Sequence, residues 1–114
     1  DKIPNLFFLG YVSDENAKSL MRNCKAFLFP STFEGFGIPP LEALSLGTKV
    51  ICANAASLPE ICEGAVDYID PYQYNVDFKT IDKRDQSENS GAVLSKYSWI
   101  KSAKDFYVFL KAVS

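Results

Sequence analysis

Two glutamates flank a glycine-rich turn in the stretch STFEGFGIPPLEALSLG. Glu34 comes directly before the turn, and Glu42 lies eight positions later, in the first turn of a helix that we expect to begin near Pro39. A carboxylate accepts two hydrogen bonds side by side, which fits neighbouring hydroxyls on a sugar ring or a ribose. The spacing therefore predicts a hydroxyl-binding acid at each end of the turn.

The turn between the two acids is suited to an anion. Gly35 and Gly37 have no Cβ, so the backbone there can approach a ligand closely. The following helix directs its positive dipole end and its unpaired N–H groups at the turn, and both favour a diphosphate. Because prolines donate no hydrogen bond, the donors must come from residues 35–38 and 41–43. A sugar, a diphosphate and a ribose in line form a nucleotide-sugar, which fits this pattern.

The two acids also have a simpler interpretation. Glu42 could be an acid that favours the helix dipole, an effect of about 0.3–1 kcal/mol, and Glu34 could be a solvated loop residue. A pair of glutamates at this spacing does not by itself decide between the two interpretations.

The rest of the sequence predicts the elements that hold the turn. Four apolar runs are expected as strands: residues 5–12, 26–30, 49–54 and 66–70. Helices are expected after Ser13, from Pro39 to Gly47, from the capping-box pair Ser57 and Glu60, and from Ser98 onward. The pattern weakens after residue 72, where we expect one irregular helix and a loop at residues 88–91. The last helix has an apolar face, which we expect to be buried, formed by Trp99, Ala103, Phe106, Leu110 and Val113.

This alternation predicts an α/β fold with a Rossmann-like parallel sheet and flanking helices. In such sheets ligands bind beyond the carboxyl ends of the strands. The Glu34 turn follows the second expected strand at that end, so its position alone makes it the best candidate site.

Composition excludes several kinds of function. The 114 residues suffice for one domain, and a net charge of −2 gives no sign of a nucleic-acid surface. The absence of histidine removes Ser-His-Asp and Cys-His catalysis and most catalytic zinc sites. The three cysteines are expected to be buried or half-buried in a reducing compartment. Since no apolar run of about 20 residues and no secretory leader is visible, we expect a cytoplasmic location, at the inner membrane face in a longer protein.

The chain closely resembles the retaining GT-B glycosyltransferases, in particular glycosyltransferase family 4. Their E-x₇-E pattern matches here from Pro30 and Ser31 through the two glutamates to Val50 and Ile51, and S-L-P-E follows at residues 57–60. The sequence YSW at residues 97–99, with a helix after it, is similar to the end of that family's second domain. Residues 1–114 therefore resemble the later part of the C-terminal, nucleotide-sugar-binding domain.

The resemblance implies a role for each site residue. Glu34 would be the catalytic residue that contacts the donor sugar, and Glu42 would hold the ribose. Backbone groups of Gly35, Phe36, Gly37, Ile38 and Leu41 would bind the sugar and diphosphate. The base would lie near Tyr11 and Val12. The donor would be a UDP- or GDP-sugar, no metal or other cofactor would be needed, and the leaving diphosphate would help to deprotonate the acceptor.

The resemblance also implies what the chain lacks. The family's basic pair that grips the diphosphate, the first two strands of the domain and the N-terminal domain that binds an acceptor glycan or lipid carrier are not matched. We therefore expect sugar transfer by the family, but an incomplete catalyst in this chain alone. The alternative is a non-catalytic nucleotide-sugar binding or interaction module. A dinucleotide-binding G-x-G-x-x-G is absent, because Pro40 stands at the third glycine position. In the doubly wound strand order the first expected strand would have no neighbour, so we expect the chain either to self-associate or to be part of a longer protein.

Overall fold

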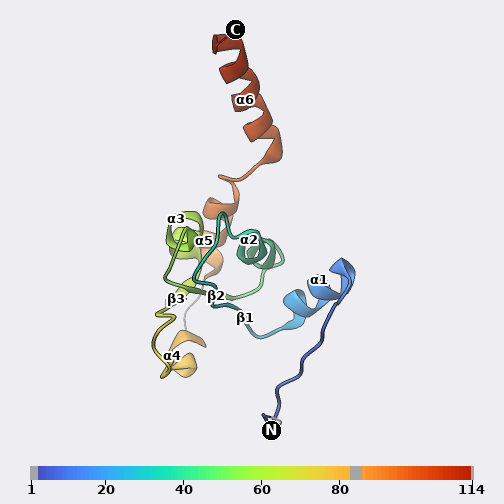
Figure 1. Ribbon diagram of the computed structural model, residues 1–114, viewed down its shortest axis with the longest axis vertical. Coiled ribbons are helices and arrows are strands. Elements are labelled where there is room, and N and C mark those ends of the chain that lie inside the picture. Colours follow the sequence, from blue (N-terminus) through green and yellow to red (C-terminus); the bar gives the residue numbers. More distant parts are fainter. Residues whose placement is uncertain (1–2, 83–85, 114) are drawn as a thin grey trace.

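The computed structural model describes residues 3–82 and 86–113. A three-stranded parallel sheet in the order β1-β2-β3 forms its centre, from strands Phe27–Phe29, Val50–Ala53 and Asp67–Ile69 (Figure 1). All three lie within the runs predicted to be strands. The helices are α1 Asp14–Asn23, α2 Ile38–Ser45, α3 Leu58–Cys62, α4 Phe78–Asp82, α5 Ser87–Leu94 and α6 Trp99–Val113, with a 3₁₀ turn η1 at Glu63–Ala65. The α/β fold class predicted from the sequence, a Rossmann-like parallel sheet with flanking helices, is confirmed.

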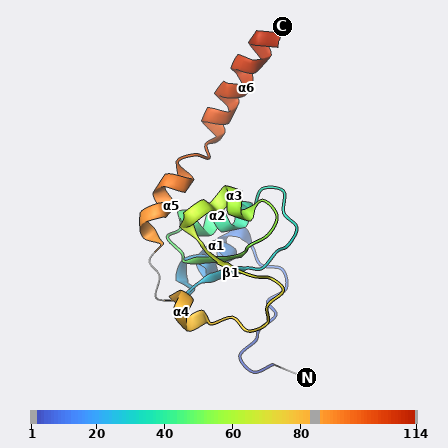
Figure 2. The same ribbon diagram turned by 90° about the vertical axis from the view of Figure 1, so that its left-hand side faces the viewer.

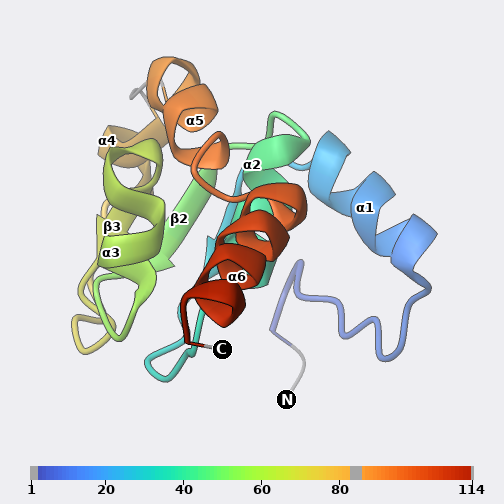
Figure 3. The same cartoon turned by 90° about the horizontal axis from the view of Figure 1, so that it is seen from above.

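The core lies between the sheet and one layer of helices. Helices α2, α3 and α5 cover one face of the sheet, α4 lies on the other side, and α1 lies beside α2 (Figures 2 and 3). In β2, Val50 and Cys52 are fully buried and belong to the same core cluster as Leu58 and Cys62 of α3. Burying an aliphatic side chain of this size contributes about 1.5–3 kcal/mol, so this layer fixes α2 and α3 on the sheet.

Local sequence signals explain where α1 and α2 begin and end. The Ser13 hydroxyl accepts a hydrogen bond from the Asn16 N–H at 3.3 Å and caps α1, as predicted. Pro39 and Pro40 lie in the first turn of α2, also as predicted. Gly47, with φ of 76°, follows the end of this helix in the left-handed conformation expected of a glycine stop.

A glutamine side chain extends the hydrogen bonding of the sheet at Val50, one residue before β2 begins to pair with β3. Gln86 donates to the Val50 carbonyl and accepts from the Val50 N–H, both at 2.9 Å, and it also donates to the Asp67 carboxylate at 2.7 Å. All three residues are buried. The amide side chain thus makes the two bonds that a strand residue would make, which spares the buried backbone an unpaired donor and acceptor.

Three expectations about segments outside the sheet are wrong. Residues 5–12 form no strand, because no strand of the described sheet lies beside them, and Phe8 is 91% exposed. Helix α6 forms as predicted, but its apolar face is not buried; it projects away from the sheet (Figure 1) and has no buried residue. Residues 88–91, expected as a loop, belong to helix α5, whose Val93 packs into the core.

The cysteines divide into two kinds. Cys52 and Cys62 are buried, as expected, whereas Cys24 is exposed and its thiol donates to the Met21 carbonyl at 3.1 Å. The expectation for Cys24 was wrong because α1 lies at the margin of the domain and has no buried residue.

The exposed segment at residues 5–12 leads to a prediction about association. Leu6, Phe7 and Phe8 follow one another in the chain and are all exposed, and exposed apolar surface favours contact with a second copy. We expect sedimentation velocity to show concentration-dependent self-association of the chain, and the charged variant Phe8→Glu to reduce it.

Tyr74→Glu serves as the matched control, because Tyr74 is 99% exposed and lies outside this segment. A monomer at every concentration, or an equal response to both variants, would contradict the prediction.

Candidate functional site

The Glu34 loop, defined as residues 30–37, connects the carboxyl end of β1 to the first residue of α2. This is the edge of a parallel sheet at which ligands bind, as predicted. Among the described residues, no hydrogen-bond acceptor is found for the backbone N–H groups of residues 35–38. Gly35, Phe36 and Ile38 are exposed, whereas Gly37 is buried. The exposed residues therefore offer peptide donors to a ligand.

The start of α2 limits which of its amides can bind an anion. Gly37 is the N-cap residue, with φ of 80° and ψ of 48°. The first four N–H groups of a helix have no partner within it, and two of those four positions here are Pro39 and Pro40, which have no N–H. Gly37 and Ile38 are left as the helix-end donors, which are two of the residues predicted to bind the donor diphosphate.

Gly37 is also packed too tightly for any other residue. A Cβ at this position would lie 2.8 Å from Cδ2 of Leu58, whose side chain is fully buried. The positive φ and the close contact both require glycine here. Gly37 thus has a structural role in joining α2 to α3 beside its predicted role in binding.

Ser57 at the start of α3 bonds to the loop instead of to its own helix. The spacing of Ser57 and Glu60 predicted a capping box, but Ser57 makes no side-chain capping bond. Its hydroxyl donates to the Glu34 carbonyl at 3.1 Å. The capping-box prediction is therefore wrong, because a carbonyl 23 residues earlier in the chain is the acceptor.

Tyr97, between α5 and α6, holds the other side of the loop. Its ring meets the Phe36 ring edge-on, with the ring centres 5.2 Å apart, and its hydroxyl donates to the Ile61 carbonyl at 3.0 Å. Burial raises the pKa of Tyr97, so the phenol remains protonated and able to donate this bond near neutral pH. The contact joins the loop to α3 and to the root of α6.

A hollow of about 780 Å³ lies against α2 and the first turn of α6. Four of the predicted donor-binding residues line it together with two further aromatic residues; the six are Phe36, Ile38, Leu41, Glu42, Tyr97 and Trp99. Glu42 is exposed and lies in the second turn of α2, not in the first as expected, and the first turn of this helix contains no acid. Because the dipole effect falls off within the first turn of a helix, it explains little of why an acid is found at position 42.

Not every predicted site residue lies in this hollow. Glu34 is half-buried in the loop and is not among the lining residues, nor are Gly35 and Gly37. Tyr11 is 96% exposed and Val12 is half-buried, and both lie in the segment that forms no strand, away from the hollow. Their assignment to the base stays a prediction. Tyr97 and Trp99 are lining residues to which sequence reasoning gave no ligand, although both lie in the YSW motif that it singled out.

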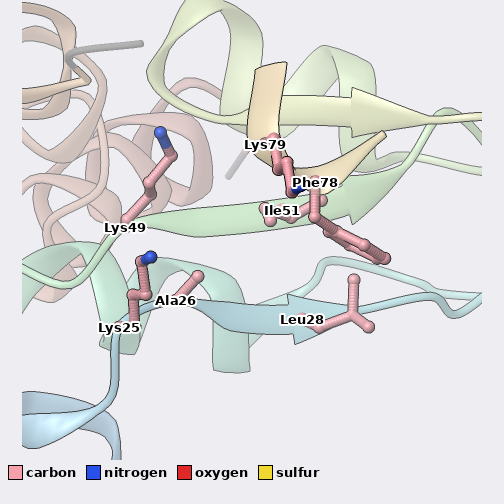
Figure 4. Close-up of a pocket in the computed structure, with 7 residues that line it drawn as sticks. All are labelled: Lys25, Ala26, Leu28, Lys49, Ile51, Phe78 and Lys79. Atoms are coloured by element: carbon pink, nitrogen blue, oxygen red, sulfur yellow. The ribbon is translucent and has the colours of Figure 1, made fainter. Parts of the chain in front are cut away.

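A second hollow, of about 380 Å³, lies on the opposite side of the sheet (Figure 4). Leu28 and Ile51 of the sheet and Phe78 of α4 form its apolar part, and Lys25, Lys49 and Lys79 complete the lining. Lys49 already pairs with Asp67 at 3.7 Å and donates to the Ile81 carbonyl. Lys25 and Lys49 precede β1 and β2, so this hollow extends toward the amino ends of the strands, away from the Glu34 loop.

The buried thiols do not provide a nucleophile. A hydrogen bond with the Cys62 thiol and burial both raise the pKa of the Cys52 thiol, whereas the same hydrogen bond lowers the pKa of the Cys62 thiol. It is burial of both side chains that keeps them from a substrate. Neither side chain is accessible to solvent. Carboxylates, peptide N–H groups and the hydroxyl-bearing residues that line the hollow are therefore the chemistry that this site offers.

Residues 2–84 match the family model described as glycosyl transferases group 1. The chain belongs to this family. The match covers well over half of the 114 residues, and it includes the Glu34 loop, α2 and the whole sheet. The glycosyltransferase character that the sequence predicted is thereby confirmed.

Several relatives in this group are named mannosyltransferases. The chain is 47% identical over 64 residues to O-antigen chain mannosyltransferase B of Escherichia coli, and the aligned region covers 56% of this chain and 17% of that protein. It is 32% identical over 106 residues to the serotype-specific mannosyltransferase WbdA of Escherichia coli, covering 86% of this chain and 13% of that protein. An uncharacterized glycosyltransferase, MJ1607 of Methanocaldococcus jannaschii, is 33% identical over 109 residues, covering 86% of this chain and 28% of that protein.

The chain spans between 13% and 28% of the length of these three relatives. No solved structure matches the chain. Among the residues that the structure describes, no helix is long and apolar enough to cross a membrane.

Proposed function

We propose that this chain forms the donor-binding part of a retaining glycosyltransferase that uses a nucleotide-sugar. The observation that supports the proposal most directly is the Glu34 loop. It lies at the carboxyl end of a parallel strand and presents peptide N–H groups for which no acceptor is found in the described part of the chain. It contains Glu34, and Glu42 of the next helix lines a hollow of about 780 Å³. Such a volume suffices for a ligand of nucleotide-sugar size.

Each part of the loop has a chemical role in this proposal. Glu34 accepts hydrogen bonds from donor-sugar hydroxyls and faces the reacting carbon. The Gly37 and Ile38 amides at the start of α2 bind the diphosphate, whose negative charge grows as it leaves. Glu42 binds the ribose hydroxyls. The sugar is transferred with retention of configuration, and the leaving diphosphate helps to deprotonate the acceptor, so that no metal ion is required.

The relatives suggest which sugar is transferred. Because O-antigen chain mannosyltransferase B and WbdA are named for mannose, we propose a mannosyl donor and a role in polysaccharide synthesis in the cytoplasm. The acceptor, a glycan or a lipid carrier, would bind a further domain that residues 1–114 do not supply. A non-catalytic nucleotide-sugar binding module remains the second candidate, since the chain has the donor-side residues only.

A titration of the chain with UDP, GDP, UDP-glucose and GDP-mannose tests the binding function. A ligand at 100 times its dissociation constant should stabilise the folded chain by about 2.7 kcal/mol, which thermal unfolding detects readily. Stabilisation by a nucleotide-sugar supports the proposal, and no response to any of the four ligands would overturn it.

Glu42→Ala should weaken binding of the nucleotide and of the nucleotide-sugar alike. Loss of a hydrogen bond to a charged group costs about 1.5–3 kcal/mol, which corresponds to a rise in dissociation constant of about 10- to 100-fold. Isothermal titration calorimetry with GDP and GDP-mannose measures both constants.

Glu15→Ala is the matched control for Glu42→Ala. Glu15 is an exposed acid in the first turn of α1, and its replacement should leave both dissociation constants unchanged. If Glu42→Ala changed neither constant, the ribose assignment would be wrong.

A further inference from the structure

The start of α3 holds the Glu34 loop at two adjacent points. The Ser57 hydroxyl donates to the Glu34 carbonyl at 3.1 Å, and the neighbouring Leu58 side chain packs directly beneath Gly37. One contact is polar and the other apolar, and they fix the two ends of the segment 34–37. Helix α3 in turn is anchored by Leu58 and Cys62, both fully buried in the core.

The Ser57 hydroxyl is free to do this because α3 does not use it. An N-cap serine normally accepts a hydrogen bond from the N–H of the second or third residue of its helix. The second residue of α3 is Pro59, which has no N–H. The hydroxyl carries a single proton, which it uses in the hydrogen bond to the backbone carbonyl of Glu34. The serine in the S-L-P-E motif therefore acts on the loop and not on its own helix.

A loop with glycines at positions 35 and 37 needs such a fixed point. Glycine has more accessible backbone conformations than other residues, so the peptides on either side of Gly35 would otherwise reorient freely. Fixing the Glu34 carbonyl restricts both the Glu34 backbone and the next peptide, whose N–H is one of the proposed donors. The Cα of Glu34, from which its side chain projects, is restrained with the backbone.

We infer that Ser57 is a positioning residue for the sugar end of the site, acting through the Glu34 carbonyl; the inference rests on the proposed function. Because Glu34 is proposed to contact the sugar and Glu42 the ribose, loss of the Ser57 hydroxyl should affect the sugar contact alone. The variant Ser57→Ala should therefore weaken nucleotide-sugar binding without weakening nucleotide binding.

The binding test compares dissociation constants for GDP and GDP-mannose in the 114-residue chain. In Ser57→Ala the affinity for GDP-mannose should fall about 3- to 10-fold while the affinity for GDP stays within about twofold. Ser57→Thr, which keeps a hydroxyl, should restore most of the loss. Ser90→Ala is the matched control, because the half-buried Ser90 hydroxyl also donates to a carbonyl, that of Gln86 at 2.8 Å, and lies outside the loop and α3.

A second measurement needs no ligand and keeps the two proposals separable. Amide ¹⁵N relaxation of the ligand-free chain should give order parameters of about 0.85 for residues 34–37. In Ser57→Ala those of residues 34 and 35 should fall below about 0.6, while that of Gly37, which Leu58 holds, should stay; Ser90→Ala should change none of them. Unchanged order parameters in Ser57→Ala would overturn the inference about Ser57. If the wild-type chain bound neither ligand while the loop still lost order in Ser57→Ala, the proposed function would fail and the positioning role of Ser57 would stand.

Discussion

Glu34→Gln should lower the rate of sugar transfer by about 10²- to 10³-fold, the usual effect of removing one group that stabilises charge in a transition state. Glutamine keeps the size and one acceptor oxygen of the side chain but has no charge to offer the reacting carbon. Nucleotide binding should change little, because the ribose and diphosphate are proposed to bind Glu42 and the α2 amides.

The rate can be measured in a hybrid enzyme in which this chain replaces the matching segment of an active group 1 glycosyltransferase. The maximal rate should fall far more than the Michaelis constant for the donor rises. Glu15→Gln in α1 is the control and should leave both constants unchanged. If Glu34→Gln weakened donor binding by the same factor as the rate, Glu34 would be a ground-state binding residue, and the catalytic assignment would be wrong.

Gly37→Ala should destabilise the folded chain by about 2–5 kcal/mol. The left-handed backbone at φ of 80° adds about 1–2 kcal/mol for a residue with a Cβ. Contact of that Cβ with Leu58, 2.8 Å away and fully buried, adds about 1–3 kcal/mol, because a packed side chain cannot move aside freely. Urea unfolding measures the loss, and binding of a nucleotide-sugar should fall with it as the loop shifts.

Gly47→Ala separates the two causes. Gly47 has nearly the same backbone angle, with φ of 76°, but a Cβ there meets nothing within 4 Å. The variant Gly47→Ala should therefore lower the free energy of unfolding only by the backbone contribution, about 1–2 kcal/mol. Equal losses in the two variants would show that the contact between Gly37 and Leu58 is unimportant.

The sequence predicted those parts of the fold that short-range patterns determine. The apolar runs of β1, β2 and β3, the Ser13 cap and the Gly47 stop are all local signals, and each is found in the structure. The position of the Glu34 loop followed from the order of strands and helices alone. Phe36, Ile38, Leu41 and Glu42, named from the E-x₇-E resemblance, line one hollow, and their binding roles stay a prediction.

Three of the failed predictions depend on contacts between distant residues. Residues 5–12 have the composition of a strand, but a strand also requires a neighbour with which to form hydrogen bonds, and the described sheet provides none. The apolar face of α6 is real, yet no described element covers it. Ser57 has capping-box spacing, but its hydroxyl meets a carbonyl that only the folded chain brings near. Gln86 lies where the sequence signal was weak, so its place in the sheet could not be predicted.

The position of Tyr97 has a consequence for α6. Tyr97 is two residues before this helix, touches Phe36 of the Glu34 loop through its ring, and bonds to α3 through its hydroxyl. A partner that binds the exposed face of α6 and turns the helix would therefore pull on the same aromatic pair. The angle at which α6 leaves the domain and the position of the Phe36 ring in the Glu34 loop therefore both depend on Tyr97.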